Sequence, residues 1–477
     1  MAISTDIFFA SISEIGGKLR AKEFSAVELT RAFCDRLERL GPRYNALALS
    51  LRNQALRQAR DVDDELKRDR TRGPLQGIPY AVKDLLAVKG GPTTWGARPF
   101  AAQVFDEDAK VIQNLSKTGA ILIGKLAMVE LAGGGGYNSA AASLTGPGLN
   151  PWDRTRWSGG SSSGPGAAMA AGLAAFTLGS ETSGSILTPS AFCGVTGLRP
   201  TYGLVSRRGA MALSWTLDKI GPMCRSAEDC AFVLRTIAGG DIEDPGSAGK
   251  SFNYQPQYAR RPQEMTVGYA PVDFDGWADP DARPAFQTAL GVMKSLGFQI
   301  KEVELPDLPY GELVETIIAG ESASIFEDLI RTGRVDELAD KQQIAGLKAS
   351  LELPAIEYLR AMRVRTLVQE AFRNLFLDVE MLLAPSRTGV APKVSEPLDG
   401  RGTPLFSRPA SRGLSEIIPA ANLAGLPALS LPCGFAGGLP IAISVVGRPF
   451  QENQLIAVGN AFQTQTDWHR RRPPVGE

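Results

Sequence analysis

The chain has 477 residues, 44% of them hydrophobic, and its 51 basic and 51 acidic side chains cancel. This balance gives no electrostatic reason to expect nucleic acid or a membrane as a partner. No apolar run approaches the roughly 18 residues that span a bilayer. The N-terminal stretch through Gly17 has neither the basic segment nor the cleavage site of a signal peptide, so we expect a cytoplasmic protein with a large core.

Cysteine and histidine restrict the chemistry that the chain can perform. The five cysteines are scattered without a CxxC spacing, which predicts buried, reduced thiols and no zinc site (Cys34, Cys193, Cys224, Cys230 and Cys433). The single histidine, His469, lies in a basic run near the C-terminus. A Ser–His–Asp triad would have to recruit it, so we expect a nucleophile with another base, and neither a metal nor a cofactor.

Two amphipathic helices are predicted near the N-terminus. Ser25 and Glu28 fit a capping box, and an apolar stripe follows in the helix expected over residues 25–40. Residues 51–67 repeat the pattern with a charged outer face. We interpret the pair as a helical preface packed on something larger.

Lys83 differs from an ordinary lysine in its surroundings. Residues 78–82 predict a short buried strand, and Lys83 lies where that strand ends. Most lysines are exposed and solvated, but apolar side chains flank this one on both sides in the sequence. Burial disfavours the charged form of an amine, so we expect the pKa of Lys83 to be lowered.

A run of four glycines, Gly133–Gly136, follows an expected helix over residues 111–119 and a strand over residues 120–124. The run lacks the strand–GxGxxG–helix context and the Lys-Ser/Thr pair of a phosphate-binding loop. We interpret it as a close-packed wall beside a site. The candidates for contact with a substrate are Gly133, Gly134, Gly135 and Tyr137.

Residues 157–200 hold the densest run of Gly, Ala and Ser in the chain. Small residues let backbones approach closely and leave N–H groups accessible. A flexible linker has a similar composition but would not contain the apolar run AAMAAGLAAF. We expect a helix over 164–173, a strand over 174–178, a turn over 182–185 and a helix from Ile186. Ser185 then lies at a strand-to-helix turn that can stabilise an oxyanion, although its position fits a helix N-cap equally well.

The rest of the chain predicts strands that alternate with helices. Loops are expected over 203–222 and 385–412, strands over 265–269, 298–303, 379–384, 428–432 and 441–446, and helices over 281–296 and 313–376 with a break at 352–354. This alternation indicates the α/β class, with a single large mixed sheet covered by helices on both faces.

Three side chains suggest a chemistry: a buried lysine, a serine in a Gly-Gly-Ser-Ser-Ser loop, and a serine at a turn rich in N–H groups. A neutral lysine can act as base for a serine, and a second hydroxyl between them can relay the proton. Four segments resemble the amidase signature family: KDLLAVKG from Lys83, GGSSSG from Gly159, ETSGSILTPSAFCGVTGLRPTYG from Glu181, and the block from Asn422 to Phe450. The two serine motifs stand at that family's spacing of 24 residues.

The resemblance covers nearly the whole chain and implies hydrolysis of amide C–N bonds through an acyl-enzyme. It also implies one domain with the amidase signature fold, residues 1–477. The expected parts are the helical preface (1–69), a catalytic core (70–240), a variable region that supplies much of the substrate pocket (241–376), and the C-terminal part of the core (377–477).

The resemblance implies roles for individual residues. Ser185 matches the nucleophile, and Ser161 matches a bridging serine that the family holds through a cis peptide bond. Lys83 matches the general base and acid, which takes a proton through Ser161 and returns it to the leaving amine. The oxyanion hole is expected from the backbone N–H groups of Thr182, Ser183, Gly184 and Ser185.

Three positions around the nucleophile depart from the family's commonest pattern. Many members have an aspartate where this chain has Glu181, which we expect to keep a supporting role as a carboxylate. Ser183 adds a hydroxyl near the oxyanion hole, and the sequence assigns it no role. The usual arginine after Ile186 is replaced by Leu187, which removes a charge near the site.

The identity of the amide is open between two readings. LRPTYGLVSRRGAMA and LDKIGPM resemble the A subunit of a glutamine-dependent tRNA amidotransferase, but such subunits commonly carry an acidic residue just before GLP, where this chain has Gly437. A site for glutamine should match both of its charges. We therefore expect a stand-alone amidase for uncharged or aryl amides, including anilides and carbamates (urethanes), that acts on a small molecule as a monomer or homodimer.

Four aromatic residues near the motifs predict an apolar pocket: Trp95, Tyr137, Trp152 and Trp157. Burial in the core is the alternative role for each of them. The alternative from another class is a catalytically silent binding subunit. The presence of Lys83, Ser161 and Ser185 together argues against it.

Overall fold

Eleven strands form one sheet through the described part of the computed structural model, which comprises residues 3–258, 260–398 and 412–475. The strands are β1 (Leu47–Ser50), β2 (Pro79–Lys83), β3 (Ile121–Leu126), β4 (Phe176–Glu181), β5 (Thr196–Arg199), β6 (Lys219–Cys224), β7 (Thr266–Tyr269), β8 (Gln299–Glu302), β9 (Met381–Pro385), β10 (Ala428–Ala436) and β11 (Leu439–Gly447). From edge to edge they run β1-β3-β2-β4-β6-β5-β10-β11-β9-β7-β8.

Parallel and antiparallel pairs are mixed within this sheet. β2 is parallel to both β3 and β4, and β7 is parallel to both β8 and β9. The other pairs are antiparallel, including the long hairpin of β10 and β11. The predicted single mixed sheet of an α/β protein is confirmed.

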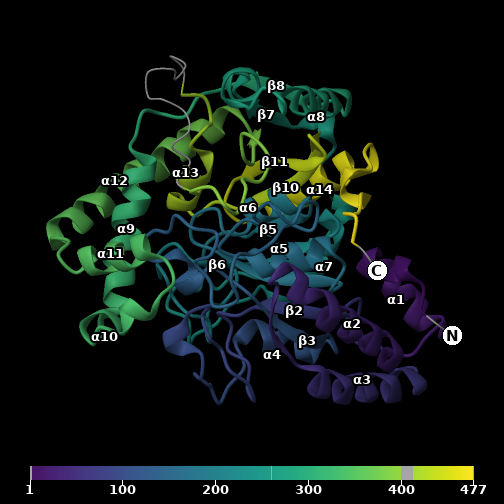
Figure 1. Cartoon of the computed structure of the whole chain (residues 1–477). Helices are drawn as coiled ribbons and strands as arrows, with labels where there is room; N and C mark the ends of the chain where they lie inside the picture. The colour runs from purple at the N-terminus through teal and green to yellow at the C-terminus, as the bar shows by residue number, and fades with distance from the viewer. Residues whose placement is uncertain (1–2, 259, 399–411, 476–477) are drawn as a thin grey trace.

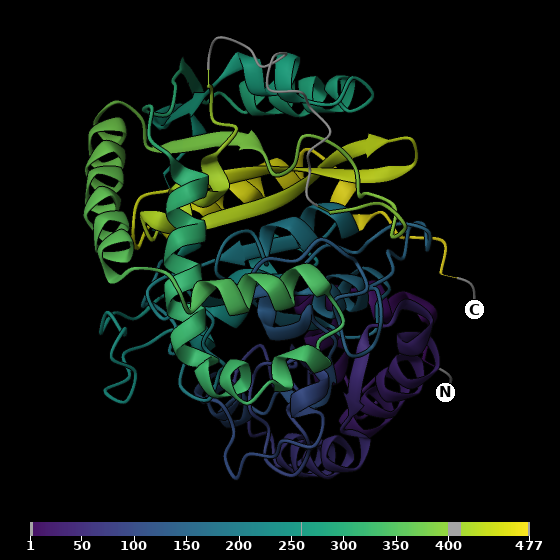
Figure 2. The same cartoon turned by 60° about the vertical axis from the view of Figure 1, so that its left-hand side comes forward.

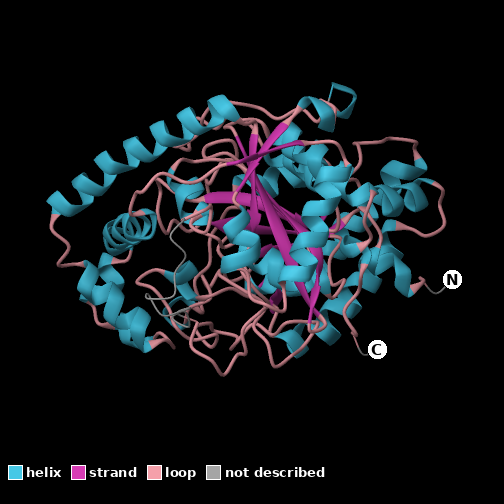
Figure 3. Cartoon of the chain, turned by 90° about the horizontal axis from the view of Figure 1, so that it is seen from above, coloured by secondary structure: helices cyan, strands magenta, loops and turns pink. Residues whose placement is uncertain are grey.

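Helices surround the sheet on both faces (Figure 3). Those of the described residues are α1 (Ile12–Arg20), α2 (Ala26–Leu40), α3 (Arg52–Lys67), α4 (Lys110–Lys117), α5 (Ser163–Ala170), α6 (Leu187–Cys193), α7 (Ala227–Ile237), α8 (Arg283–Ser295), α9 (Tyr310–Ile325), α10 (Glu327–Arg331), α11 (Lys341–Ser350), α12 (Ala355–Asp378), α13 (Ile417–Leu423) and α14 (Glu452–Thr464).

The strand β10 shows how both faces are covered. Leu429 and Leu431 contact α14 at Gly459, where the close packing leaves no room for a Cβ. Ser430 lies between them in the strand and therefore points to the opposite face. On that face its cross-strand partner Gly197 contacts Ser190 of α6. The two apolar layers are α14 on one side and α6 on the other, and α6 is the helix that follows Ser185.

The helices that flank the sheet form two groups (Figures 1 and 2). The first, α1 to α3, is drawn in purple at the lower right of Figure 1, where α2 and α3 pack on β3 near one edge of the sheet. The second, α9 to α12, is drawn in green at the left, where α11 and α12 both pack on α9. The division of the chain into four parts stays a prediction.

The helix α2 forms where the sequence predicts it because its first turn caps itself. The Ser25 hydroxyl accepts the Glu28 N–H at 3.1 Å, and the Glu28 carboxylate accepts the Ser25 N–H at 2.8 Å. The apolar stripe of Leu29, Phe33 and Leu37 is fully buried. The predicted capping box and the predicted inward face are both confirmed.

Two predicted regions differ from the structure. Residues 203–222 are expected to be loops, but β6 begins at Lys219 and is buried along its whole length. Gly221 and Pro222 are turn signals in a single sequence, and pairing with β4 and β5 on either side outweighs them. The loop predicted over 385–412 begins one residue later, because Pro385 belongs to β9, and its residues 399–411 lie outside the described part of the chain.

The long helical region predicted over 313–376 contains more breaks than expected. The predicted break at 352–354 is confirmed, because α11 ends before it and α12 begins after it. The chain also leaves the helix between α10 and α11, where Gly333 has a φ of +76° and Asp340 accepts the first N–H groups of α11. A glycine can end a helix and a capping carboxylate can start the next one, while the periodic spacing of apolar residues in the sequence continues.

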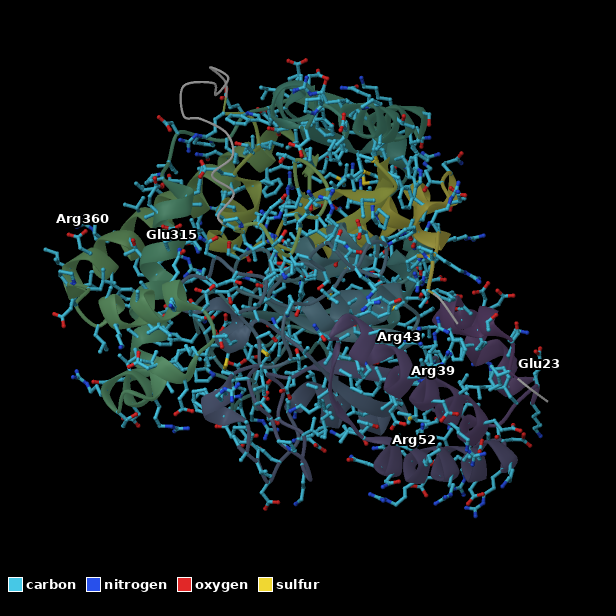
Figure 4. The ribbon with its side chains drawn as sticks, viewed as in Figure 1. Glu23, Arg39, Arg43, Arg52, Glu315 and Arg360 are labelled. Atoms are coloured by element: carbon cyan, nitrogen blue, oxygen red, sulfur yellow. The ribbon has the colours of Figure 1, made fainter. Side chains whose placement is uncertain are left out.

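Charged side chains lie on the outer faces of the flanking helices (Figure 4). Arg360 of α12 is exposed and lies at the edge of the molecule, as does Glu23 in the loop between α1 and α2. Among the described residues, no helix is both long enough and apolar enough to cross a membrane.

Candidate active site

Lys83 is the last residue of β2 and its side chain is fully buried. Its Nζ lies 2.7 Å from Ser161 Oγ and 3.0 Å from Ser180 Oγ. Burial lowers the pKa of Lys83 to about 7, against smaller opposing effects of Asp218 and Glu181. The predicted buried lysine with a lowered pKa is confirmed, and much of this amine is neutral at pH 7.

Ser161 lies directly beside this amine and is 1% exposed. The Gly160–Ser161 peptide bond is cis, as the family resemblance implies. The Ser161 carbonyl accepts the N–H of Val129 at 3.1 Å, which fixes the backbone next to β3. Gly160 has no room for a Cβ, which would lie within 3 Å of side-chain atoms of Trp157, Val129 and Tyr137.

Ser185 lies in the turn between β4 and α6 and retains 8% exposure. Gly184 has a φ of +87°, which favours glycine at this position. The N–H of Ser162 donates to the Ser185 carbonyl at 3.3 Å and joins the two serine segments. Ser161 Oγ bonds the amine of Lys83, and among the described residues no hydrogen bond joins it to the Ser185 hydroxyl.

Glu181 holds this turn in place. One carboxylate oxygen accepts the N–H groups of Ile186 at 2.9 Å and Leu187 at 3.0 Å. The other accepts Arg199 Nη1 at 2.8 Å and Asn422 Nδ2 at 2.9 Å. Burial alone would raise the pKa of Glu181, but Arg199 and Asn422 hold the pKa at about 2. The predicted supporting role of this carboxylate is confirmed.

Thr182 connects the turn to a small cavity. Its hydroxyl donates to Asp218 Oδ1 at 2.6 Å, and Asp218 Oδ2 accepts the N–H groups of Leu213 and Ser214. Burial raises the pKa of Asp218. The cavity has a volume of about 230 Å³, and its lining includes Ser180, Thr182, Asp218, Met211 and Trp215. The cavity therefore lies next to Ser180, one of the two serines whose hydroxyls bond Lys83.

The glycine loop packs closely, as predicted. A Cβ on Gly133 would lie 2.7 Å from the Tyr137 ring, and one on Gly135 would lie 2.7 Å from the carbonyl oxygen of Gln343. Gly133 and Gly135 also have φ values of +93° and +82°. Contact of Gly133, Gly134, Gly135 and Tyr137 with a substrate stays a prediction.

Two of the four expected aromatic residues gather beside the site. The ring centroids of Tyr137 and Trp157 are 6.1 Å apart, and Phe192, which the sequence analysis missed, lies 6.3 Å from Trp157. Trp95 instead packs on Phe100, Phe105 and Phe326. Trp152 packs on Phe435, and its Nε1 donates to the carbonyl of Cys193.

Arg387 is a site residue that sequence reasoning missed. It follows β9, and its Nε donates to Thr188 Oγ1 at 2.9 Å across 199 residues of chain. Leu187 itself carries no charge, as the sequence analysis states, but a guanidinium from another segment bonds its neighbour Thr188. No local signal marks Arg387, since it lies in a stretch that reads as a surface loop.

The chain's histidine lies away from the serines. His469 lines a large cavity together with Arg225, which follows the end of β6. In the antiparallel pair, Lys219 of β6 faces Glu181, so the opposite end of β6 is remote from the turn that carries Ser185. All five cysteines are buried and unpaired, as predicted. Within the described residues, no group of three or more His, Cys, Asp or Glu side chains could hold a metal ion.

Comparison with known proteins confirms the family resemblance. A model of the amidase family matches residues 28–456. The chain is 36% identical to the A subunit of glutamyl-tRNA(Gln) amidotransferase from Carboxydothermus hydrogenoformans, over 98% of this chain and 100% of the relative. It is 37% identical to the protein of that name from Moorella thermoacetica, over 99% of both. The peptide amidase of Stenotrophomonas maltophilia shares the fold, with a TM-score of 0.83, 29% identity and 98% of each chain covered.

These relatives correct the expected partners. The sequence analysis predicts a small-molecule amide as the substrate, no nucleic acid, and a monomer or homodimer. That prediction is wrong, because relatives matched along their whole length are named as one subunit of an enzyme that acts on a tRNA. The balanced charge of 51 basic and 51 acidic residues misled the prediction, since one subunit need not carry the charge that binds the assembly's nucleic acid.

Proposed function

Because the chain belongs to the amidase family and cleaves amide C–N bonds, we propose that Ser185, Ser161 and Lys83 perform this hydrolysis through an acyl-enzyme, with glutamine as the amide. The observation that supports this mechanism most directly is the 2.7 Å contact between Lys83 Nζ and Ser161 Oγ in a fully buried setting. A buried amine with a pKa near 7 can accept a proton without histidine.

The reaction proceeds in two halves. Neutral Lys83 takes the proton of Ser161 while Ser161 takes that of Ser185, and Ser185 Oγ attacks the amide carbon. The C–N bond then breaks as protonated Lys83 returns its proton through Ser161 to the nitrogen, which leaves as ammonia. Water attacks the acyl ester through the same relay, which releases the carboxylic acid and restores the Ser185 hydroxyl.

The backbone of the turn stabilises the oxyanion that forms in both halves. The N–H groups of Ile186 and Leu187 already donate to the Glu181 carboxylate. The N–H groups of residues 182–185 come earlier in the turn, and these are the donors that we assign to the oxyanion. Fixed donors aimed at the developing charge need no reorganisation during the reaction.

Glutamine is preferred over an aryl amide on the strength of sequence similarity. Relatives at 36% and 37% identity over nearly the entire chain bear the amidotransferase name. The sequence analysis argued against glutamine because Gly437 stands where A subunits commonly carry an acidic residue. Gly437 lies in the turn between β10 and β11. We propose that ammonia passes to a tRNA-bound acceptor held with a partner subunit. The five buried, unpaired cysteines fit the cytoplasmic setting of this proposal.

The test is ammonia or amine release from glutamine, asparagine, an aliphatic amide, a nitroanilide and an aryl carbamate. Ammonia from glutamine, absent with Ser185→Ala, supports the proposal. Turnover of only the anilide or the carbamate overturns the choice of glutamine and supports the competing reading of an aryl amide or urethane hydrolase, which the rings of Tyr137, Trp157 and Phe192 favour. Failure of Ser185 to react with a fluorophosphonate would favour a silent binding subunit.

A further inference from the structure

Arg387 is an exposed residue whose guanidinium lies beside the turn that carries Ser185. Its Nε donates to Thr188 Oγ1 at 2.9 Å, and its Nη2 bonds the same hydroxyl. A Cβ built on Gly184 would lie 3.3 Å from Arg387 Nη2. Gly184 directly precedes Ser185, so the guanidinium lies next to the residue that adjoins the nucleophile in the chain.

This guanidinium has hydrogen-bond donors to spare. An arginine has five N–H donors, and the Thr188 hydroxyl occupies only one edge of the group. In the described part of the chain, no carboxylate forms an ion pair with Arg387. The carboxylate of Glu181 exerts some attraction on it, but Arg199 and Asn422 already bond that group.

Other arginines in the interior are used differently. Arg199 pairs with Glu181, and Arg365 donates to the backbone carbonyls of Leu423 and Thr216. Both guanidinium groups bond acceptors within the protein and support the fold, although Nη2 of Arg199 is buried without a hydrogen-bond partner among the described residues. Arg387 instead bonds a neutral hydroxyl, and desolvation of its guanidinium lowers the pKa of Arg387. A cation in this setting gains most from an anion supplied by a ligand.

We propose that Arg387 binds a carboxylate of the substrate, so that the site selects amides whose acyl chain ends in a carboxylate. The inference rests on the proposed function and names the substrate class of the same site. Glutamine belongs to that class, and so do the monoamides of short dicarboxylic acids. A guanidinium and a carboxylate form two parallel hydrogen bonds, which fix orientation as well as charge.

Thr188 sets the direction in which Arg387 points. Its hydroxyl accepts from both Nε and Nη2. These bonds fix the plane of the guanidinium, and among the described residues the remaining N–H groups are available to a ligand. Thr188 is in the first turn of α6.

The experiment compares matched pairs of amides: succinamate with butyramide, and glutaramate with valeramide. Each pair differs by a carboxylate in place of a methyl group. The wild-type chain is expected to favour the carboxylate amide of at least one pair by about 10- to 100-fold in kcat/KM. Arg387→Met is expected to lower that ratio at least tenfold, mainly through KM, and Arg387→Lys to keep part of the preference.

Two further variants make the comparison specific. Arg373→Met, which removes an exposed arginine on α12, is expected to keep both the activity and the ratio of the wild type. Thr188→Val keeps the shape of the residue but removes the acceptor of the guanidinium, so it is expected to reduce the preference less than Arg387→Met does. Equal ratios in the wild type and Arg387→Met overturn the inference while leaving amide hydrolysis intact.

Binding separates this inference from the proposed function. Succinate and glutarate, the acids that the amides would release, are titrated calorimetrically into Ser185→Ala with and without Arg387→Met. The dissociation constant of at least one diacid is expected to rise tenfold or more when Arg387 is removed. Binding that is absent or independent of Arg387 overturns the inference, even if no amide of the panel is hydrolysed. Catalysis that fails while Arg387-dependent binding persists overturns the proposed function alone.

Discussion

Lys83 Nζ and Ser161 Oγ lie 2.7 Å apart although 78 residues separate them in the chain. The end of β2 positions the lysine, and the segment just before α5 positions the serine. Both side chains are out of contact with solvent, so the amine has few competing proton donors. In the proposed mechanism the two residues act as one unit in proton transfer, so their mutational effects should not be additive.

The pH dependence of amide hydrolysis should follow the titration of Lys83. Burial lowers the pKa of this lysine from 10.5 to about 7, and only the neutral amine accepts a proton. Activity should therefore fall about tenfold per pH unit below pH 7 and level off above it. Values of kcat/KM between pH 5 and 9, measured with a substrate that does not titrate, check this. A maximum near pH 5 would count against Lys83 as the base.

Replacing Lys83 should remove most of the activity. Lys83→Met is expected to lower kcat by about 10²- to 10⁴-fold, the usual worth of a general base. Lys83→Arg should be no better, because a guanidinium does not lose its proton near neutral pH. Lys117→Met, at an exposed position of α4, provides the control for the loss of one positive charge. The values of kcat from steady-state kinetics of the folded variants check this prediction.

Covalent labelling should identify Ser185 among the serines of the site. A fluorophosphonate is expected to add once to the wild-type chain, with the mass shift on the peptide that contains Ser185. Ser185→Ala should not react. Ser183→Ala, which removes the more exposed hydroxyl two residues earlier, should react at nearly the wild-type rate. Labelling that survives in Ser185→Ala but disappears in Ser183→Ala would reassign the nucleophile.

Glu181 should contribute stability that is lost in acid. The pKa of its carboxyl is held at about 2, below the usual 4.5, so the stabilisation is complete above about pH 5 and declines as the pH falls toward 2. The amount is on the order of 3 kcal/mol. Glu181→Gln should be less stable at pH 7 by about 3–5 kcal/mol, because Arg199 loses its counter-charge.

Urea unfolding of Glu181→Gln at several pH values measures both effects. The variant should lack the acid-dependent part of the free energy of unfolding that the wild type shows between pH 5 and pH 3. The matched control is Glu315→Gln, at an exposed position of α9 that Figure 4 labels. Parallel curves for the wild type and Glu181→Gln would show that the carboxylate is not what holds the turn.

Two neighbouring glycines offer a matched test of the glycine loop. Gly135 and Gly136 have similar φ values of +82° and +77°, so alanine is strained equally at both. A Cβ at Gly135 would clash with the backbone near Gln343, whereas one at Gly136 would meet nothing within 4 Å. Gly135→Ala should therefore cost about 1–3 kcal/mol more than Gly136→Ala in thermal or urea unfolding. Equal costs would mean that the loop does not pack against α11.

The sequence was sufficient where a signal lies within a few residues. The capping box of Ser25 and Glu28 and the apolar stripe of α2 are read from one turn to the next, because helix capping and amphipathicity are local. β6 was missed for the opposite reason. Gly221 and Pro222 are unfavourable in an isolated strand, and only the flanking strands β4 and β5 make that segment extended.

The sequence by itself determined which residues we propose for the chemistry: Lys83 after a buried strand, and Ser161 and Ser185 in stretches of small residues. The tertiary structure alone decided what surrounds them. Contacts such as Arg387 with Thr188 join positions 199 residues apart, and the pKa of Lys83 depends on everything packed around its amine. Sequence patterns record neighbours along the chain, whereas desolvation and electrostatic pairing depend on neighbours in space, which only the assembled sheet and its helices specify.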